Sequence, residues 1–197
     1  MSEFEVFSPE NSTLLLIDHQ IGTMGWVRSI SFEEMKQNAI VLAKAAAATK
    51  IPVVLTSSQE DRAQGPLLKE FETILPDAFA KRVKRAGLVN CWKDTAFASA
   101  AKAPGRKNII MAGVTNDVCT VYPAMSAVQE GYRVQVVADA GGSPSKFADD
   151  IALQRMKDAG VTLTTTNQLI AELAQDWSAA NGQKLIQILF EDVFSKL

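Results

Sequence analysis

Short apolar runs alternate with helical patterns along most of the chain. The runs lie at 13–18, 51–56, 107–113, 133–139 and 161–166, with a further short strand expected at 81–85. Strands that are apolar along their whole length are typical of parallel sheets covered by helices on both faces. We therefore predict an α/β fold, a doubly wound (Rossmann-like), mostly parallel six-stranded sheet with helices on both faces.

Helical spacing of apolar residues fills the segments between these runs. Ser31 and Glu34 fit a capping box, so a helix is expected to begin there. Further helices are expected at 67–75, 93–102, 117–130 and 146–159, and from 167 onward.

The chain has 197 residues, of which 47% are hydrophobic. This is enough for one well-buried core and short for two. We predict one domain over 1–180, followed by a C-terminal helix over 181–197. Leu185 and Leu189 share one face of that helix. The helix is expected either to pack on the core of its own domain or to form an oligomerisation arm that reaches a neighbouring subunit.

The composition argues against several classes of partner. A formal net charge of -2 and a sequence pI near 5.5 give no case for nucleic-acid binding, and the basic cluster at 81–85 is too short to change that. No apolar run approaches the roughly 18–20 residues of a membrane span. The N-terminal segment lacks the pattern of a signal peptide, and two cysteines cannot build a disulfide framework. A cytoplasmic protein with reduced thiols is expected.

The predicted topology brings a carboxylate and a thiol to one place. In doubly wound sheets, ligands bind beyond the carboxyl ends of the strands, where the strand order reverses. In the commonest order this point lies between the first strand, which ends in Asp18, and the fourth, which ends before Val114–Cys119. Cys119 would lie in the first turn of a helix, where the helix dipole favours a thiolate. The alternative is a small buried apolar cysteine.

Three motifs resemble the isochorismatase-like cysteine hydrolase family: IDHQ at the end of the first strand, GVTNDVC, and QEGYRVQVVADA. The resemblance covers residues 12–178 and implies the isochorismatase-like hydrolase fold. It also implies an Asp–Lys/Arg–Cys catalytic triad, in which Asp18 takes the proton of the nucleophile Cys119. Spacing to the downstream residues favours Arg85 as the basic member, with Lys84 as the alternative.

The resemblance further implies how the reaction would proceed. A cis peptide at Val114–Thr115 would aim the N–H groups of Thr115 and Cys119 at an oxyanion. The expected reaction is attack on the carbonyl of a small amide-type substrate, loss of an amine or ammonia, and hydrolysis of the thioester. Trp26, Trp92 and Phe97 are the expected substrate-binding residues, although each could equally serve ordinary core or subunit packing.

The chain departs from two branches of the family. Nicotinamidases bind a metal through aspartate and histidines near the second strand, but residues 57–66 contain no histidine. We therefore expect no metal, no cofactor and no nicotinamide substrate. True isochorismatases replace the cysteine, so that activity is not expected either. The single histidine, His19, is expected to be structural, because neighbours on a strand point to opposite faces.

Other polar residues near this sheet edge have simpler expected roles. Asp139 could form a loop hydrogen bond or take part in catalysis. Asn116 and Asp117 are expected to shape the turn or cap a helix, and Cys91 is expected to be a buried bystander.

The sequence is also compatible with two other functions. The protein could be a thiol-based redox or sensing protein that uses Cys119, with Cys91 as resolving partner. It could also be a non-catalytic protein that binds a small molecule on the same fold. The resemblance implies a homo-oligomer, a tetramer or octamer, and leaves the substrate open.

Overall fold

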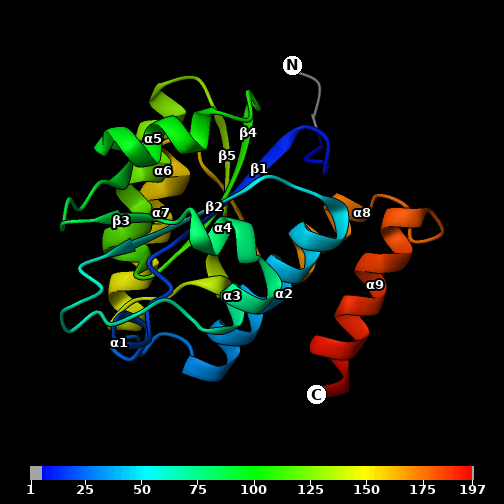
Figure 1. The fold of residues 1–197 in the computed structure, drawn as a ribbon, viewed down its shortest axis with the longest axis horizontal. Helices are drawn as coiled ribbons and strands as arrows, with labels where there is room; N and C mark the ends of the chain where they lie inside the picture. Colours follow the sequence, from blue (N-terminus) through cyan, green and yellow to red (C-terminus); the bar gives the residue numbers. More distant parts are fainter. Residues whose placement is uncertain (1–5, 197) are drawn as a thin grey trace.

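The computed structural model describes residues 6–196 and contains a six-stranded sheet in which every pair of neighbouring strands is parallel. The strand order is β3-β2-β1-β4-β5-β6, so the order reverses between β1 and β4 (Figure 1). The predicted fold class and the predicted reversal point are both confirmed. The strands are β1 (Ser12–Ile17), β2 (Val53–Ser58), β3 (Val83–Arg85), β4 (Asn108–Gly113), β5 (Arg133–Val137) and β6 (Thr162–Thr164).

Helices cover both faces of the sheet. On one face, α2 and α8 bury their apolar sides toward the strands and α9 packs on α2 and α8, and on the other face α5, α6 and α7 cover the sheet (Figure 1). The helices are α1 (Ile21–Met24), α2 (Phe32–Thr49), α3 (Glu70–Ile74), α4 (Pro76–Ala80), α5 (Thr95–Lys102), α6 (Val121–Gln129), α7 (Lys146–Asp158), α8 (Thr166–Ala174) and α9 (Ala180–Asp192).

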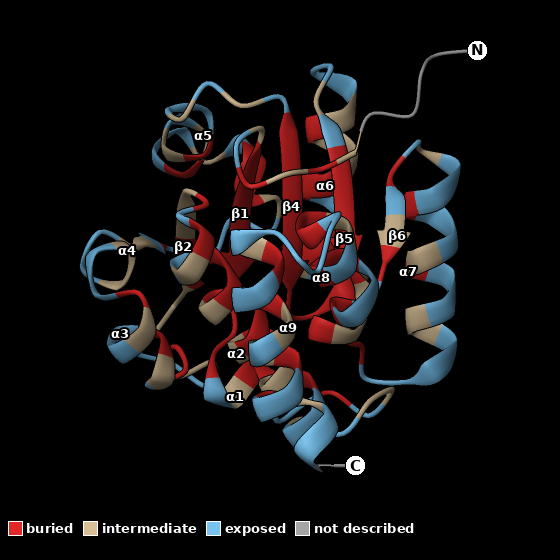
Figure 2. Ribbon diagram, turned by 90° about the vertical axis from the view of Figure 1, so that its right-hand side faces the viewer, coloured by how far each residue is buried: buried red, intermediate tan, exposed pale blue. Residues whose placement is uncertain are grey.

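Side-chain alternation along the strands explains why the strand sequences are continuously apolar. Leu14 and Leu16 of β1 join the cluster under α2, α8 and α9, whereas Leu15 and Ile17 join the cluster under α5, α6 and α7. Successive strand residues point to opposite faces, and here both faces are covered. Figure 2 shows the result, with β1 and β4 buried along their whole length.

The helix predicted at 117–130 begins later than expected. A π-helical turn over Asn116–Thr120 precedes α6 (Val121–Gln129). The carbonyl of Thr115 accepts the N–H groups of Val118, Cys119 and Thr120 at 3.3, 2.9 and 3.1 Å. Because these bonds converge on one carbonyl, the chain is wound into a wider turn before it becomes α-helical. Cys119 therefore lies in this turn and not in the first turn of α6.

The start of α2 matches its prediction. Ser31 is the N-cap residue, and its hydroxyl accepts the backbone N–H of Glu34 at 3.1 Å. This bond satisfies one of the free N–H groups at the helix start.

The C-terminal helix α9 packs on the domain that precedes it. Leu185 and Leu189 are buried in the same cluster as the apolar side of α2, and Asp192 pairs with Lys44 at 2.6 Å. Phe190 lies on the outer side and is 59% exposed. Residues 1–5 and Leu197, which belong to the predicted spans 1–180 and 181–197, lie outside the described residues. The boundary at residue 180 stays a prediction.

Within residues 6–196, no helix combines the length and apolar character needed to cross a membrane.

Candidate active site

Asp18 and Arg85 meet at the carboxyl edge of the sheet. Asp18 directly follows β1 and adopts a left-handed backbone conformation with φ 56°, and its N–H donates to the carbonyl of Thr56 at 2.9 Å. Arg85 is the last residue of β3. Both side chains are 1% exposed, and Nη2 of Arg85 donates to both carboxylate oxygens of Asp18. A buried carboxylate thus has its counterion in direct contact.

The other nitrogens of Arg85 also have partners. Nε donates to the hydroxyl of Thr56 at 2.9 Å, and Nη1 donates to the carbonyl of Leu88 at 2.6 Å. Lys84 points away from this cluster, because its side chain is 61% exposed and pairs with Glu60 at 3.1 Å. Of the two basic residues considered from the sequence, only Arg85 contacts Asp18.

The thiol of Cys119 completes the cluster by donating a hydrogen bond to the carboxylate of Asp18. Burial raises the pKa of Cys119, and the negative charge of Asp18 and the hydrogen bond to it raise the pKa further. Arg85 and the backbone of Thr115 oppose this rise without cancelling it. The resting thiol is therefore protonated, unlike the thiolate predicted from the helix start, because burial and Asp18 outweigh the positive groups.

Asp18 is placed to receive the proton of this thiol. The pKa of Asp18 is raised, because burial outweighs the charge of Arg85, its hydrogen bonds and the bond from Cys119, which all lower the pKa. The contact of Arg85 with both oxygens favours the ionised carboxylate. The arrangement can transfer a proton from sulfur to carboxylate without an intervening group, and so generate a nucleophile.

The turn before Cys119 contains the cis peptide Val114–Thr115 that was predicted. Thr115 is 6% exposed. The N–H of Cys119 donates to the carbonyl of Thr115 at 2.9 Å, so this amide is engaged within the turn. The use of the Thr115 and Cys119 amides as oxyanion donors stays a prediction.

The predicted substrate-binding residues occupy different environments. Trp92 and Phe97 are 3% and 0% exposed within the core beneath α5 and α6, and the Trp92 ring meets Tyr132 edge-on at 5.4 Å. Their positions favour the packing role that was the alternative for each. Trp26 is 47% exposed and is the one of the three with surface available to a ligand or a neighbouring subunit.

His19 and Cys91 have buried positions. Nε2 of His19 lies 2.8 Å from the carbonyl of Ala140, its ring meets Phe71 edge-on, and burial lowers its pKa to about 4. Cys91 is 0% exposed, and burial raises its pKa to about 12. These environments fit the structural roles expected for both residues.

Asn116 helps to fix the turn that contains Cys119. Its Nδ2 donates to the carbonyl of Ala138 at 3.2 Å and to Asp149 at 3.1 Å, as expected for a residue that shapes the turn. Asp117 does not cap a helix. Its buried Oδ1 has no hydrogen-bond partner among the described residues.

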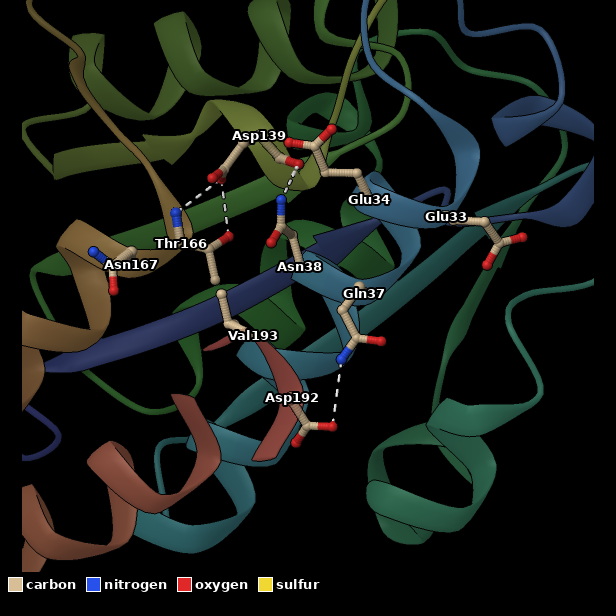
Figure 3. Close-up of a pocket in the computed structure, with 9 residues that line it drawn as sticks. All are labelled: Glu33, Glu34, Gln37, Asn38, Asp139, Thr166, Asn167, Asp192 and Val193. Atoms are coloured by element: carbon tan, nitrogen blue, oxygen red, sulfur yellow. Dashed lines mark hydrogen bonds between the residues drawn. The ribbon is translucent and has the colours of Figure 1, made fainter. Parts of the chain in front are cut away.

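Asp139 belongs to a separate cavity of about 610 Å³ (Figure 3). One of its carboxylate oxygens accepts the N–H and the hydroxyl of Thr166 at 2.8 Å each. This bonding supports the loop role considered for Asp139. The residues that line the cavity come from the starts of α2 and α8, the loop after β5 and the end of α9, and they do not include Asp18, Arg85 or Cys119: Glu33, Glu34, Gln37, Asn38, Asp139, Thr166, Asn167, Asp192 and Val193.

Sequence reasoning missed Thr56 and the carbonyl of Leu88, which both bind Arg85. Thr56 ends an otherwise apolar run, VVLT, and this polar residue next to the predicted reversal point is the only signal that could have marked it. A backbone carbonyl such as that of Leu88 leaves no trace in sequence. Among residues 6–196 no group of three or more His, Cys, Asp and Glu side chains is arranged to hold a metal ion.

Comparison with known proteins identifies the same family of hydrolases that the sequence motifs resemble. The model of the isochorismatase domain family matches residues 12–168. The Escherichia coli protein named "Probable hydrolase YcaC" is 37% identical over 167 residues, which are 85% of this chain and 79% of that protein.

Two solved structures share the fold and about a third of the sequence. The structure of E. coli YcaC, described as an octameric hydrolase of unknown specificity, has a TM-score of 0.93 at 33% identity and covers 99% of this chain and 94% of its own. YcaC from Pseudomonas aeruginosa, solved with hexane-2,5-diol and covalent acrylamide, has a TM-score of 0.93 at 34% identity and covers 99% and 95%.

Proposed function

The chain belongs to the isochorismatase domain family, and from that premise we propose that it is a hydrolase with Cys119 as nucleophile. The proposed reaction cleaves the C–N bond of a small amide-type substrate through a thioester intermediate. The observation that carries this proposal is the direct contact of Asp18 with both Arg85 and Cys119.

In the first half of the reaction, Asp18 takes the proton of Cys119 as the sulfur attacks the substrate carbonyl carbon. The C=O electrons move onto oxygen, which the amide of Thr115 would stabilise, joined by the amide of Cys119 once it leaves the carbonyl of Thr115. When the carbonyl re-forms, the C–N bond breaks and the nitrogen takes the proton held by Asp18. An amine is a poor leaving group unless it is protonated, so a proton stored beside the sulfur serves the second step as well as the first.

In the second half, Asp18 removes a proton from water, and the hydroxide oxygen attacks the thioester carbon. The sulfur then leaves and recovers the proton, which returns Cys119 to its thiol form. Arg85 stays positively charged throughout and stabilises the negative charge that passes between Asp18 and Cys119. The reaction consumes one water and releases a carboxylic acid and an amine or ammonia.

A solved relative supports a reactive nucleophile in this group. The YcaC of P. aeruginosa was solved with covalent acrylamide. Acrylamide is a small amide whose alkene alkylates thiolates, so a covalent adduct fits a nucleophilic cysteine.

We propose that the reaction uses no metal ion. This part of the proposal rests on the sequence, since residues 57–66 contain no histidine.

We also propose that the protein is a homo-oligomer, a tetramer or octamer, and that it is cytoplasmic. The relative from E. coli is described as octameric. A thiol-sensing role has less support, because Cys91 is 0% exposed and burial raises its pKa to about 12, so little of the thiolate that would resolve an oxidised Cys119 is present.

The test is release of amine or ammonia from a panel of small primary and secondary amides. Wild type is expected to turn over at least one member. Cys119→Ala and Asp18→Asn are expected to lose about 10³-fold or more of the rate, as for residues that act as one catalytic unit. Cys91→Ser is the matched control and should keep turnover. Turnover that survives in Cys119→Ala would exclude this mechanism, and inactivity on every amide together with ready oxidation of Cys119 by peroxide would favour the sensing role.

A further inference from the structure

We infer that Thr56 is a positioning residue for the proposed reaction: its buried hydroxyl orients the guanidinium of Arg85 toward Asp18. This inference rests on the proposed function, because it acts through Arg85. Thr56 lies outside the three motifs that carry the family resemblance.

The direction of each hydrogen bond at Thr56 follows from its chemistry. The hydroxyl lies 2.7 Å from the carbonyl of Val83 and 2.9 Å from Nε of Arg85. A carbonyl only accepts, so the single hydroxyl proton must point to Val83. The oxygen lone pairs then face Arg85, whose Nε only donates. The Thr56 hydroxyl is thus held as an acceptor for Arg85.

This acceptor fixes the plane of the guanidinium. The group is planar and rigid, so contacts at two of its nitrogens determine where the third points. Nε is held by Thr56 and Nη1 by the carbonyl of Leu88 at 2.6 Å. Nη2 is then directed at both oxygens of Asp18. Thr56 and Leu88 come from different elements, β2 and the loop after β3, so neither strand alone sets this orientation.

Loss of the hydroxyl should affect the reaction through Asp18. Thr56 is 0% exposed and Arg85 is 4% exposed, so water has little access to replace the missing acceptor. The guanidinium would turn to find another partner and would contact Asp18 less well. Burial raises the pKa of Asp18 and Arg85 opposes that rise. A misaligned Arg85 therefore leaves Asp18 protonated up to a higher pH, where it cannot accept the thiol proton.

A purely structural role for Thr56 is separable from this one. The hydroxyl also links β2 to β3 through Val83, but the two strands are paired by their backbones from Thr56 to Ser58 in any case. Thr49 provides a matched control. Its buried hydroxyl donates to the carbonyl of Ala45 at 2.7 Å within α2, and the hydrogen bonds of Arg85 go to Thr56, Leu88 and Asp18 instead.

The experiment measures acylation of Cys119 by p-nitrophenyl acetate as a function of pH, from the burst of p-nitrophenol at its isosbestic wavelength. The variants are Thr56→Val, which keeps the shape, Thr56→Ser, which restores the hydroxyl, and Thr49→Val. Arg85→Met shows how far the pH profile moves when the guanidinium is lost altogether. Cys119→Ala gives the release of p-nitrophenol that does not depend on the thiol. Thermal unfolding of each variant checks the fold, and Thr56→Ala replaces Thr56→Val if the latter does not fold.

We expect the acid limb of the profile to move to higher pH in Thr56→Val, in the direction of Arg85→Met, with acylation about 10-fold slower on that limb. Thr56→Ser and Thr49→Val should follow wild type. A wild-type profile in Thr56→Val, or an equal shift in Thr49→Val, would overturn the inference and leave the proposed function intact. If Arg85→Met also follows wild type, or the burst survives in Cys119→Ala, the proposed function fails and the inference fails with it.

Discussion

The resting site contains a protonated Cys119 thiol hydrogen-bonded to Asp18, and it does not contain a preformed thiolate. Burial and the neighbouring carboxylate raise the pKa of Cys119, while Arg85 keeps the carboxylate paired. The nucleophile would then form only as the proton moves to Asp18. A protonated resting thiol also resists oxidation and non-specific alkylation better than a free thiolate, since the thiolate is the reactive form.

His19, beside Asp18, should make the folded state sensitive to acid. Burial lowers its pKa to about 4 in the folded protein, against about 6.5 for a histidine exposed to water. The unfolded chain therefore binds more protons between these values, so stability falls as the pH drops through this window. We expect His19 to account for about 2 kcal/mol of the stability lost between about pH 7 and pH 5.

Urea unfolding of wild type and His19→Gln at both pH values measures this contribution. Glutamine keeps a donor for the carbonyl of Ala140 but does not titrate, so the variant should lose less stability on acidification. Equal losses in the two proteins would mean that His19 is not buried in its neutral form.

The residues of the candidate site differ in how far the sequence predicted them. Asp18 and Cys119 could be placed because each follows an apolar strand on either side of the predicted reversal point. Spacing to the downstream residues favoured Arg85 over Lys84, but the strand pattern could not exclude Lys84. Successive residues of a strand point to opposite faces, and the three-residue β3 gives little pattern from which to read the inward face.

At the scale of elements, α9 behaves as part of the core. Leu185 is 0% exposed and packs in the cluster that includes α2. We expect Leu185→Ala to lower the free energy of unfolding by about 2–5 kcal/mol, as for other buried leucines. Phe190→Ala, on the outer side of the same helix at 59% exposure, should change it by less than about 0.5 kcal/mol.

Denaturant unfolding at two protein concentrations distinguishes the two sides of α9. If Phe190→Ala costs as much as Leu185→Ala, and the cost shrinks on dilution because wild type dissociates, the outer side is buried against another subunit. That result would support the arm predicted as an alternative from the sequence.

The long elements were predicted well and the tight turns were not. Periodicity extends over many residues in α2 and α7, so their positions stand out from the sequence. The π-helical turn at Asn116–Thr120 depends on several amides that share the carbonyl of Thr115, and no residue pattern encodes that sharing. α1 has four residues, too few for any periodic signal.

At the scale of the whole molecule, the alternation of strands and helices was sufficient to predict the sheet, because parallel strands need a crossover between each pair. The same pattern placed the candidate site at the reversal point. It carries no information on the substrate, which depends on exposed side chains around the loops.

The proposed homo-oligomer can be tested by the mass of the protein in solution. Its interface would cover some of the exposed apolar side chains, for which Trp26, Phe147 and Ile151 are candidates. Light scattering should give a mass of four or eight times the 21.3 kDa chain. A monomer at micromolar concentration would contradict the proposed oligomer.

The central claim is that Cys119 carries the acyl group during hydrolysis, and trapping that group tests it most directly. The protein would be mixed with p-nitrophenyl acetate, quenched in acid at successive times and analysed by peptide mass spectrometry. We predict one acetyl group on Cys119 that is short-lived in wild type. In Asp18→Asn it should form more slowly, because Asp18 takes the thiol proton, and last longer once formed, because Asp18 is needed to activate water. Acetylation elsewhere, or none on Cys119 in either protein, would contradict it.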